Sequence, residues 1–459
     1  MNTLDAVLEA AHTARIPAAR ANTTERAAWL RAIAEGLDAH SDTLVALAAE
    51  ETQLPEPRLR GEVARTTFQA RLFAERVESG DLLEVRVDRA DPDWPMGPRP
   101  DLIRGYVPIG PVLVFAASNF PFAFSVAGGD TVSALAVGCP VVVKTHDAHP
   151  KLARATADIV TTSLASAGAP DGVFGTIHSR EDGIRAIQDA RIKAAGFTGS
   201  EAGGRALYDL AASRPDPIPF FGELGSTNPV VITPAGWRER ADDIVDGFTS
   251  SFTMGCGQFC TKPGVVLVPD RDAFVDKMAL QPVHPMLYER IARGFEQTLH
   301  ELCDRQAVNV LLTGPRGANS PAATVLGTDA DAVLADPAIV TTEMFGPASV
   351  LVSYRDIAQA VEVLGAIPGA LTATIQGTTA GDPDAPRLIE AMSYLAGRVI
   401  YNQWPTGVTV SDAQQHGGPW PATTAPTTTS VGTAAAQRFA RPVAFQNMPA
   451  DILSPALGR

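Results

Sequence analysis

The fold of this chain is decided by residues 110–144, which read GPVLVFAASNFPFAFSVAGGDTVSALAVGCPVVVK. The apolar run 112–115 follows Gly-Pro and has the length and flanks of a buried strand. Residues 131–137 have a helical pattern that Gly138 ends, and residues 139–144 form the next apolar run. A strand, a helix and a second strand in this order predict a parallel sheet.

The same alternation continues along the chain. A helix is expected over about 152–167, followed by strands at 173–177 and 192–198. A second α/β segment contains apolar runs at 229–232, 264–268, 349–352 and 371–375. The sequence therefore predicts an α/β protein whose first sheet is parallel and doubly wound.

Two other regions of the chain have different sequence patterns. The first 80 residues or so are expected to be helical, and Asn22 with Glu25 three positions later is a plausible helix start. Residues 419–430, PWPATTAPTTTS, are rich in Pro and Thr. They are either a linker or an ordered loop, and a compact enzyme favours the loop.

Composition limits the possible functions. The chain has 459 residues, 45% hydrophobic and 19% charged, which indicates a globular protein of two or three domains. A formal net charge of −14 argues against nucleic acid as a partner. No stretch approaches the roughly 20 apolar residues of a membrane span, and the N-terminus lacks the long apolar run of a signal peptide. Four cysteines without repeated spacing fit a reducing compartment, so a cytoplasmic location is predicted.

Two loop motifs supply a nucleophile and a base. Residues 257–263, GQFCTKP, place Cys260 in a turn, and residues 222–229, GELGSTNP, place Glu223 beside glycine. A lone cysteine is usually a small buried hydrophobe, and a glutamate beside glycine usually lies at the surface. Together, however, the two residues provide a thiolate that attacks a carbonyl and a carboxylate that activates water to release the acyl group.

Polar side chains also follow several predicted strands. Asn119, Lys144 and Ser200 all come at or just after strand ends. Ligands of doubly wound sheets bind beyond the carboxyl ends of the strands. Position alone therefore makes these residues candidates for a site.

Several motifs resemble the ordered signatures of the aldehyde dehydrogenase superfamily. They are FTGS at 197–200, GELGSTNP at 222–229, GQFCTKPG at 257–264 and EMFGP at 343–347. The resemblance extends from about residue 100 to 447. Further segments narrow it to the branch that contains 2-oxoglutarate semialdehyde (2,5-dioxovalerate) dehydrogenases and some bacterial fatty-aldehyde dehydrogenases: SNFPFAFSVAGGDT at 118–131, KTHDAHP at 144–150, PTGV at 405–408 and HGGPWPATT at 416–424.

The resemblance implies a role for each catalytic candidate. Cys260 is the nucleophile that forms a thioester, and Glu223 is the general base for its hydrolysis. The Asn119 amide and the backbone N–H of Cys260 form the oxyanion hole. The alternatives are a structural cysteine, a helix-capping carboxylate and an Asx turn before Pro121. Relatives that acylate coenzyme A tend to lack the glutamate, so Glu223 favours hydrolysis to a free acid.

The resemblance also implies NAD or NADP as cofactor, although no GxGxxG motif follows a strand. Lys144 would contact the adenine ribose, Ser200 a phosphate and Glu343 the nicotinamide ribose, with Phe345 near the ring. Asp147 lies three residues after Lys144. If it faces the ribose, it accepts hydrogen bonds from the hydroxyls and repels a 2′-phosphate, which favours NAD slightly over NADP. If it points to solvent, cofactor choice is set elsewhere.

The substrate side depends on charge and shape. A 2-oxoglutarate semialdehyde carries an anion at its far end, and a buried carboxylate needs a cation. The candidates nearest the motifs are Lys262, Arg438 and Arg441, although each has a solvated surface charge as its alternative. Phe122 and Phe259 are expected to line the aldehyde channel, and ordinary core positions explain them equally well.

Two other residues near the motifs are not assigned a catalytic role. His416 lies in a Gly/Pro loop, where a lone histidine is usually structural. Cys256 has no matching role, although a disulfide with Cys260 is conceivable under oxidation. No metal site is predicted, because no paired Cys or His cluster lies nearby.

The family implies three parts. We expect a dinucleotide-binding domain over 1–90 and 109–225, a catalytic domain over 226–430, and an oligomerisation arm over 91–108 and 431–459. A homodimer or homotetramer is expected, because an isolated arm strand would leave a bare sheet edge. The predicted function is NAD(P)-dependent oxidation of an aldehyde to a carboxylic acid. A long-chain aldehyde dehydrogenase and a non-catalytic binding protein on the same fold are the alternatives.

Overall fold

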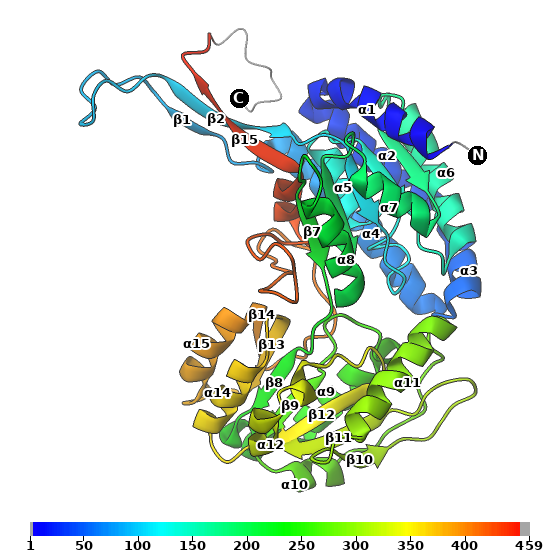
Figure 1. The fold of residues 1–459 in the computed structure, drawn as a ribbon, viewed down its shortest axis with the longest axis vertical. Helices are drawn as coiled ribbons and strands as arrows, with labels where there is room; N and C mark the ends of the chain where they lie inside the picture. Colours follow the sequence, from blue (N-terminus) through cyan, green and yellow to red (C-terminus); the bar gives the residue numbers. More distant parts are fainter. Residues whose placement is uncertain (1–2, 450–459) are drawn as a thin grey trace.

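The computed structural model describes residues 3–449 of the chain. Two β-sheets with helices packed against them form the body, and a narrow three-stranded arm projects from one side (Figure 1). Residues 450–459 of the expected arm segment lie outside the described residues. None of the helices within residues 3–449 is long and apolar enough to cross a membrane.

The N-terminal region is helical, as the sequence predicts. Its helices are α1 (Leu4–Arg20), α2 (Thr23–Ala39), α3 (Ser41–Thr52) and α4 (Glu56–Ser79). Asn22 and Glu25 form a capping box, in which each side chain accepts a hydrogen bond from the backbone N–H of the other residue. Trp29 and Leu30 of α2 and Phe73 of α4 are buried in a core that these helices share.

The first sheet is parallel, with the strand order β5-β4-β3-β6-β7. Its strands and their helices are β3 (Val112–Phe115), α5 (Gly129–Ala136), β4 (Val141–Lys144), α6 (Pro150–Ser166), β5 (Phe174–Ile177), α7 (Arg180–Gln188), β6 (Ala194–Thr198), α8 (Glu201–Ala212) and β7 (Phe220–Glu223). Val112 and Val114 face a core with α2, α5 and α6, whereas Leu113 and Phe115 face a core with α1 and α7. Helices thus cover both faces of the sheet, which confirms the predicted doubly wound architecture.

The second sheet has the order β10-β11-β12-β9-β8-β13-β14, and β10 alone runs antiparallel to its neighbour. Helix α9 covers one face of it, and α12, α14 and α15 cover the other. This region comprises β8 (Pro229–Ile232), α9 (Pro234–Thr253), the 3₁₀ turn η1 (Met254–Gly257), β9 (Val265–Val268), α10 (Arg271–Asp276), α11 (Glu289–Cys303), β10 (Asn309–Thr313), β11 (Thr324–Asp329), α12 (Ala330–Ala335), α13 (Ala338–Thr341), β12 (Ala348–Ser353), α14 (Ile357–Ala366), β13 (Ala370–Gln376), α15 (Ala385–Leu395) and β14 (Ala396–Tyr401). The four apolar runs that predicted strands in this segment are β8, β9, β12 and β13.

The projecting arm consists of β1 (Arg86–Asp88), β2 (Leu102–Pro108) and β15 (Ala440–Gln446). Strand β2 lies between the other two and pairs antiparallel with both. The 3₁₀ helix η2 (Thr433–Phe439) leads into β15 and contacts α5. Because β1 precedes residue 91, the arm sheet begins inside the segment that we expected in the dinucleotide-binding domain. The division into three functional domains remains a proposal.

The segment after β14 returns to the end of β7. Leu224 donates its backbone N–H to Ala422 O over 2.8 Å, and Thr424 donates to Gly222 O over 3.1 Å. Residues 419–430 therefore form an ordered loop beside the predicted base, as expected, and are not a linker.

Candidate active site

The carboxyl edge of the first sheet collects four of the predicted site residues. Lys144 and Glu223 are the last residues of β4 and β7. Asn119 lies in the loop after β3, and Ser200 lies just after β6. All four therefore lie where doubly wound sheets bind ligands.

The turn before Cys260 has an unusual backbone. Gly255, Cys256 and Gly257 all have positive φ values of 55°, 58° and 66°. A Cβ on Gly257 would lie 2.2 Å from Gly346 O, so only glycine fits there. These three residues, all with a left-handed backbone conformation, form the turn between α9 and the nucleophile.

Asn228 of the GELGSTNP motif holds the nucleophile turn in place through hydrogen bonds. Its Nδ2 donates to Cys260 O over 2.7 Å and to Lys262 O over 2.9 Å. Its Oδ1 accepts from the Thr372 N–H over 3.2 Å. A buried side-chain amide thus ties together two motifs and strand β13, which makes the position of Cys260 depend on all three.

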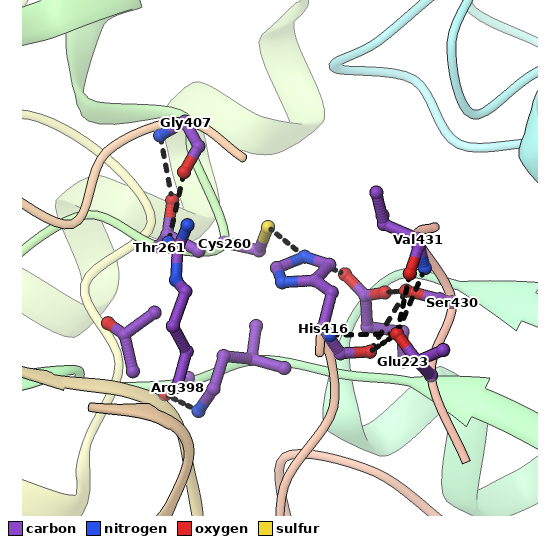
Figure 2. A network of polar contacts seen from close by, with 12 residues as sticks. Glu223, Cys260, Thr261, Arg398, Gly407, His416, Ser430 and Val431 are labelled. Carbon is purple, nitrogen blue, oxygen red and sulfur yellow. Dashed lines mark hydrogen bonds and ion pairs between the residues drawn. The ribbon is translucent and has the colours of Figure 1, made fainter. Parts of the chain in front are cut away.

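Glu223 lies in a buried polar network with His416 (Figure 2). The Ser430 hydroxyl donates to Glu223 Oε2. His416 Nε2 lies 2.8 Å from Glu223 Oε1, an ion-pair distance that lacks hydrogen-bond geometry. The same nitrogen lies 3.7 Å from Cys260 Sγ. One imidazole therefore bridges the predicted nucleophile and the predicted base.

The sequence analysis expected His416 to be structural, and the structure places it in contact with both catalytic candidates. Its ring is fully buried, and its backbone is held by Thr429 Oγ1 at 2.8 Å and by the Ser430 N–H at 2.9 Å. A single histidine that lies 156 residues from Cys260 gives no spacing signal, so the sequence could not reveal the contact. The helix-capping alternative for Glu223 is also wrong, because its carboxylate meets Ser430 and His416.

The environment of Cys260 disfavours its thiolate. Burial raises the pKa of the Cys260 thiol well above its ordinary value, and the carboxylates of Glu223 and Glu343 raise that pKa further. Arg398 opposes the shift. A proton acceptor at the sulfur would therefore assist nucleophilic attack. His416 Nε2 is within hydrogen-bond reach of that sulfur.

Arg398 of β14 holds the loop beside the nucleophile (Figure 2). Its Nη2 donates to Pro405 O and to Gly407 O over 2.8 and 2.9 Å. The Gly407 N–H in turn donates to Thr261 Oγ1 over 3.2 Å. The PTGV segment therefore supports the residue that follows Cys260, a role that the sequence analysis did not assign to Arg398.

Asn119 also reaches the nucleophile turn. Its Nδ2 donates to Gln258 O over 3.1 Å, and its backbone oxygen accepts from Arg58 over 2.7 Å. The amide has two N–H groups, so the second can serve an oxyanion beside Cys260. The Asn119 side chain therefore bonds to Gln258 in the nucleophile turn and does not close an Asx turn before Pro121.

The predicted cofactor residues lie at the expected elements. Lys144 Nζ is 2.8 Å from Asp147 Oδ1, and the side chains of the two residues are 12% and 69% exposed. Ser200 is the N-cap of α8, and its hydroxyl accepts from the Gly203 N–H over 3.3 Å. The first turn of α8 therefore points its free N–H groups to the edge where a phosphate would bind.

Glu343 lies against the GELGSTNP loop. A Cβ on Gly225 would lie 2.0 Å from Glu343 Oε2, so a larger residue there would force the Glu343 carboxylate to move. Burial raises the pKa of Glu343, and the Ser226 backbone and the Lys262 ammonium oppose the shift. Phe345 follows in the same segment and is half-buried.

The three expected anion-binding cations have different surroundings. Lys262 is buried and donates to Ala348 O. Arg438 pairs with Asp130 over 2.5 Å, and Arg441 is exposed on β15 of the arm. Arg438 nevertheless lines the small cavity beside Glu223 and His416, so a cation in the substrate channel stays a prediction.

The aromatic candidates differ from one another. Phe259 is 7% exposed and packs edge-on against Phe120, with centroids 5.3 Å apart. Phe122 is 2% exposed and belongs to the core of the N-terminal helices, which is the alternative that we kept for it. Cys256 is likewise a core side chain, and burial raises its pKa to about 12.

The cluster at Cys260 also has metal-binding donors. Within residues 3–449, ligand atoms of Glu223, Cys260 and His416 lie within 4.8 Å of one another. Thiolate, imidazole and carboxylate are the donors that zinc prefers. The sequence predicted no metal because these residues are far apart along the chain.

Comparisons with known proteins agree with this geometry. The Aldehyde dehydrogenase family model matches residues 2–282. The chain is 44% identical to alpha-ketoglutaric semialdehyde dehydrogenase 2 of Azospirillum brasilense, over 94% of this chain and 84% of that protein. It is 39% identical to alpha-ketoglutaric semialdehyde dehydrogenase of Acinetobacter baylyi, over 100% and 89%.

A solved structure shares the fold. Proline utilization A from Bdellovibrio bacteriovorus superposes with a TM-score of 0.82 at 20% identity and covers 97% of this chain. This chain spans 46% of that longer protein, so the likeness concerns the fold alone. The family match and the two relatives decide the identity: this chain belongs to the aldehyde dehydrogenase family.

Proposed function

We propose that this enzyme oxidises 2-oxoglutarate semialdehyde to 2-oxoglutarate with NAD(P). The names of the two relatives, which are 44% and 39% identical, support this substrate, since alpha-ketoglutaric semialdehyde is the same compound. The observation that carries the chemistry is the contact of His416 with both Cys260 and Glu223.

The first half of the reaction uses Cys260. Its sulfur forms a bond to the aldehyde carbon while the thiol proton passes to His416 Nε2, which lies 3.7 Å away. The aldehyde oxygen becomes negative, and the Asn119 amide and the Cys260 N–H are placed to donate to it. A dinucleotide held at this edge would supply the acceptor for the hydride that leaves the same carbon. An acyl thioester would then remain on Cys260.

The second half uses Glu223. Its carboxylate accepts a proton from the water that attacks the thioester carbon, and the Ser430 hydroxyl on Oε2 holds the carboxylate in place. The C–S bond then breaks, the acid leaves, and Cys260 regains a proton from His416. The position of Glu223 therefore supports hydrolysis over transfer of the acyl group to coenzyme A.

The residues present fit a dinucleotide. Gly225 leaves room for the Glu343 carboxylate, and Ser200 opens α8 with its first-turn N–H groups. The contact between Lys144 and Asp147 supports NAD over NADP, because it brings a carboxylate to the lysine that serves the adenine ribose. A 2′-phosphate there would meet that negative charge.

The arm supports self-association. Strands β1 and β15 are the outer strands of a small sheet that projects from the body (Figure 1). Projecting edges of this kind are usually covered. We therefore propose a homo-oligomer in which a second copy covers the arm.

A kinetic comparison tests the proposed substrate. Reduced cofactor is followed with 2-oxoglutarate semialdehyde, succinic semialdehyde, a long-chain aldehyde and an aromatic aldehyde, each with NAD and NADP. The proposal requires the highest kcat/KM for 2-oxoglutarate semialdehyde. A higher value for the long-chain aldehyde would favour a broad aldehyde dehydrogenase, and no turnover at all would favour a binding protein.

A further inference from the structure

Two arginines on the inner face of α4 lack the acidic partners that the outer arginines have. The outer ones form ion pairs with carboxylates: Arg60 with Asp42 and Glu56, Arg71 with Asp38 and Arg76 with Asp412. Arg58 Nη1 and both terminal nitrogens of Arg65 are buried and make no hydrogen bond within the described residues. Buried N–H donors without acceptors are unfavourable, so the position is prepared for an acceptor from outside the chain.

The two inner arginines share a face of the helix. They are seven residues apart, which is two turns, and Glu62 lies between them on the same face. Glu62 Oε1 accepts from the backbone N–H groups of Phe122 and Ala123 over 2.8 and 3.0 Å. One carboxylate cannot neutralise two guanidinium groups, and burial also raises the pKa of Glu62. Glu62 and, for Arg65, Glu223 act on this positive charge, but no carboxylate among the described residues forms an ion pair with it.

This charge lies beside the reacting atoms. Arg58 stacks on Phe259, the neighbour of Cys260, with its guanidinium carbon 4.9 Å from the ring centroid. Arg58 Nη2 donates to Asn119 O over 2.7 Å. Arg65 lies over Phe124 at 5.3 Å, and the charge of Glu223 acts on its guanidinium. Arg58 thus packs on a ring of the nucleophile turn, and Arg65 packs on a ring of the loop after β3.

We propose that Arg65, assisted by Arg58, binds the distal carboxylate of the aldehyde substrate and selects anionic semialdehydes. The inference rests on the proposed function. A guanidinium offers two parallel N–H donors that match a carboxylate. Arg58 and Arg65 together have three terminal nitrogens that lack a hydrogen-bond partner among the described residues. In this proposal the pair takes the role for which the sequence analysis considered Lys262, Arg438 and Arg441.

The test compares substrates that differ in the distal charge. For wild type, Arg65→Met and Arg65→Lys, kcat/KM is measured with 2-oxoglutarate semialdehyde, succinic semialdehyde and pentanal. Arg71→Met is the matched control, because Arg71 lies on the outer face of the same helix and pairs with Asp38. The ratio of an anionic aldehyde to pentanal is the quantity of interest, since any general effect on Cys260 or Glu223 cancels in it.

Loss of a charged hydrogen-bond partner should lower this ratio in Arg65→Met by about 10- to 100-fold, mainly through KM. Arg65→Lys should recover part of it, and Arg71→Met should match wild type. If wild type prefers 2-oxoglutarate semialdehyde and Arg65→Met keeps the same ratio, the inference is overturned and the proposed function stands. If wild type prefers succinic semialdehyde and the ratio still depends on Arg65, the proposed substrate falls and the inference stands. A wild-type preference for pentanal overturns both.

A binding measurement covers the case in which Arg65→Met loses all activity. Calorimetry gives the Kd of 2-oxoglutarate, the proposed product, for Cys260→Ala and for Cys260→Ala combined with Arg65→Met. The inference requires weaker binding by about 10-fold or more in the double variant. Equal Kd values would show that the two arginines serve only Glu62 and the aromatic rings.

Discussion

Replacing His416 with glutamine should weaken the nucleophile without removing it. The variant keeps a polar side chain but cannot carry a positive charge beside Cys260. At the observed 3.7 Å, an imidazolium and a thiolate attract each other by about 4 kcal/mol if the effective dielectric constant is about 20. Desolvation opposes part of this attraction, and the pKa of Cys260 should rise in His416→Gln because the remaining attraction is lost.

The expected change in rate is smaller than the change in pKa. A higher pKa lowers the thiolate fraction at neutral pH, but a more basic thiolate is also a better nucleophile. With a Brønsted coefficient of about 0.5, alkylation of Cys260 should slow by about 3- to 30-fold. In both proteins the rate should rise with pH, because burial keeps the pKa of Cys260 above its ordinary value.

The assay is the pH dependence of alkylation by iodoacetamide, followed by mass spectrometry of the peptide that contains Cys260. His300→Gln is the matched control, because the His300 side chain is 77% exposed on α11. His416→Gln should shift the curve to higher pH, and His300→Gln should leave it unchanged. A His416→Gln curve that superposes on wild type, or moves to lower pH, would refute the role of His416 at the sulfur.

Three other variants test separate parts of the site. Asn119→Ala should lower kcat by about 100-fold or more in steady-state assays if its amide stabilises the oxyanion, and a change below threefold would remove it from that role. Asp147→Thr should move the ratio of kcat/KM for NAD and NADP toward NADP; an unchanged ratio would show that its carboxylate does not act on the ribose. Gly225→Ala places a methyl group against the Glu343 carboxylate and should weaken NAD binding by about 10-fold in fluorescence titrations. An unchanged Kd would show that Glu343 does not hold the cofactor.

Local pattern was enough to predict the framework. The strands at 112–115 and 229–232 are short apolar runs between turn residues, and the capping pair Asn22–Glu25 acts within four residues. Such features depend on neighbours along the chain, so the sequence shows them directly. The motifs likewise located Cys260 and Glu223.

The partners of these residues were not predictable in the same way. His416 reaches Cys260 only because the loop after β14 folds back along β7, and Arg65 faces the site only because α4 packs against the loop after β3. Neither contact leaves a spacing pattern in the sequence. Arg438, which we chose because it lies near a motif in the sequence, pairs with Asp130, which lies about 300 residues away.

Mass spectrometry of a stalled reaction tests the thioester mechanism most directly. Glu223→Gln is mixed with 2-oxoglutarate semialdehyde and NAD(P), quenched after one turnover and digested, with Cys260→Ala treated in parallel. The Glu223→Gln protein should show one burst of reduced cofactor and an acyl group on the peptide that carries Cys260, while Cys260→Ala shows neither. Steady release of free acid by Glu223→Gln at the wild-type rate, with no acyl group on Cys260, would contradict the mechanism.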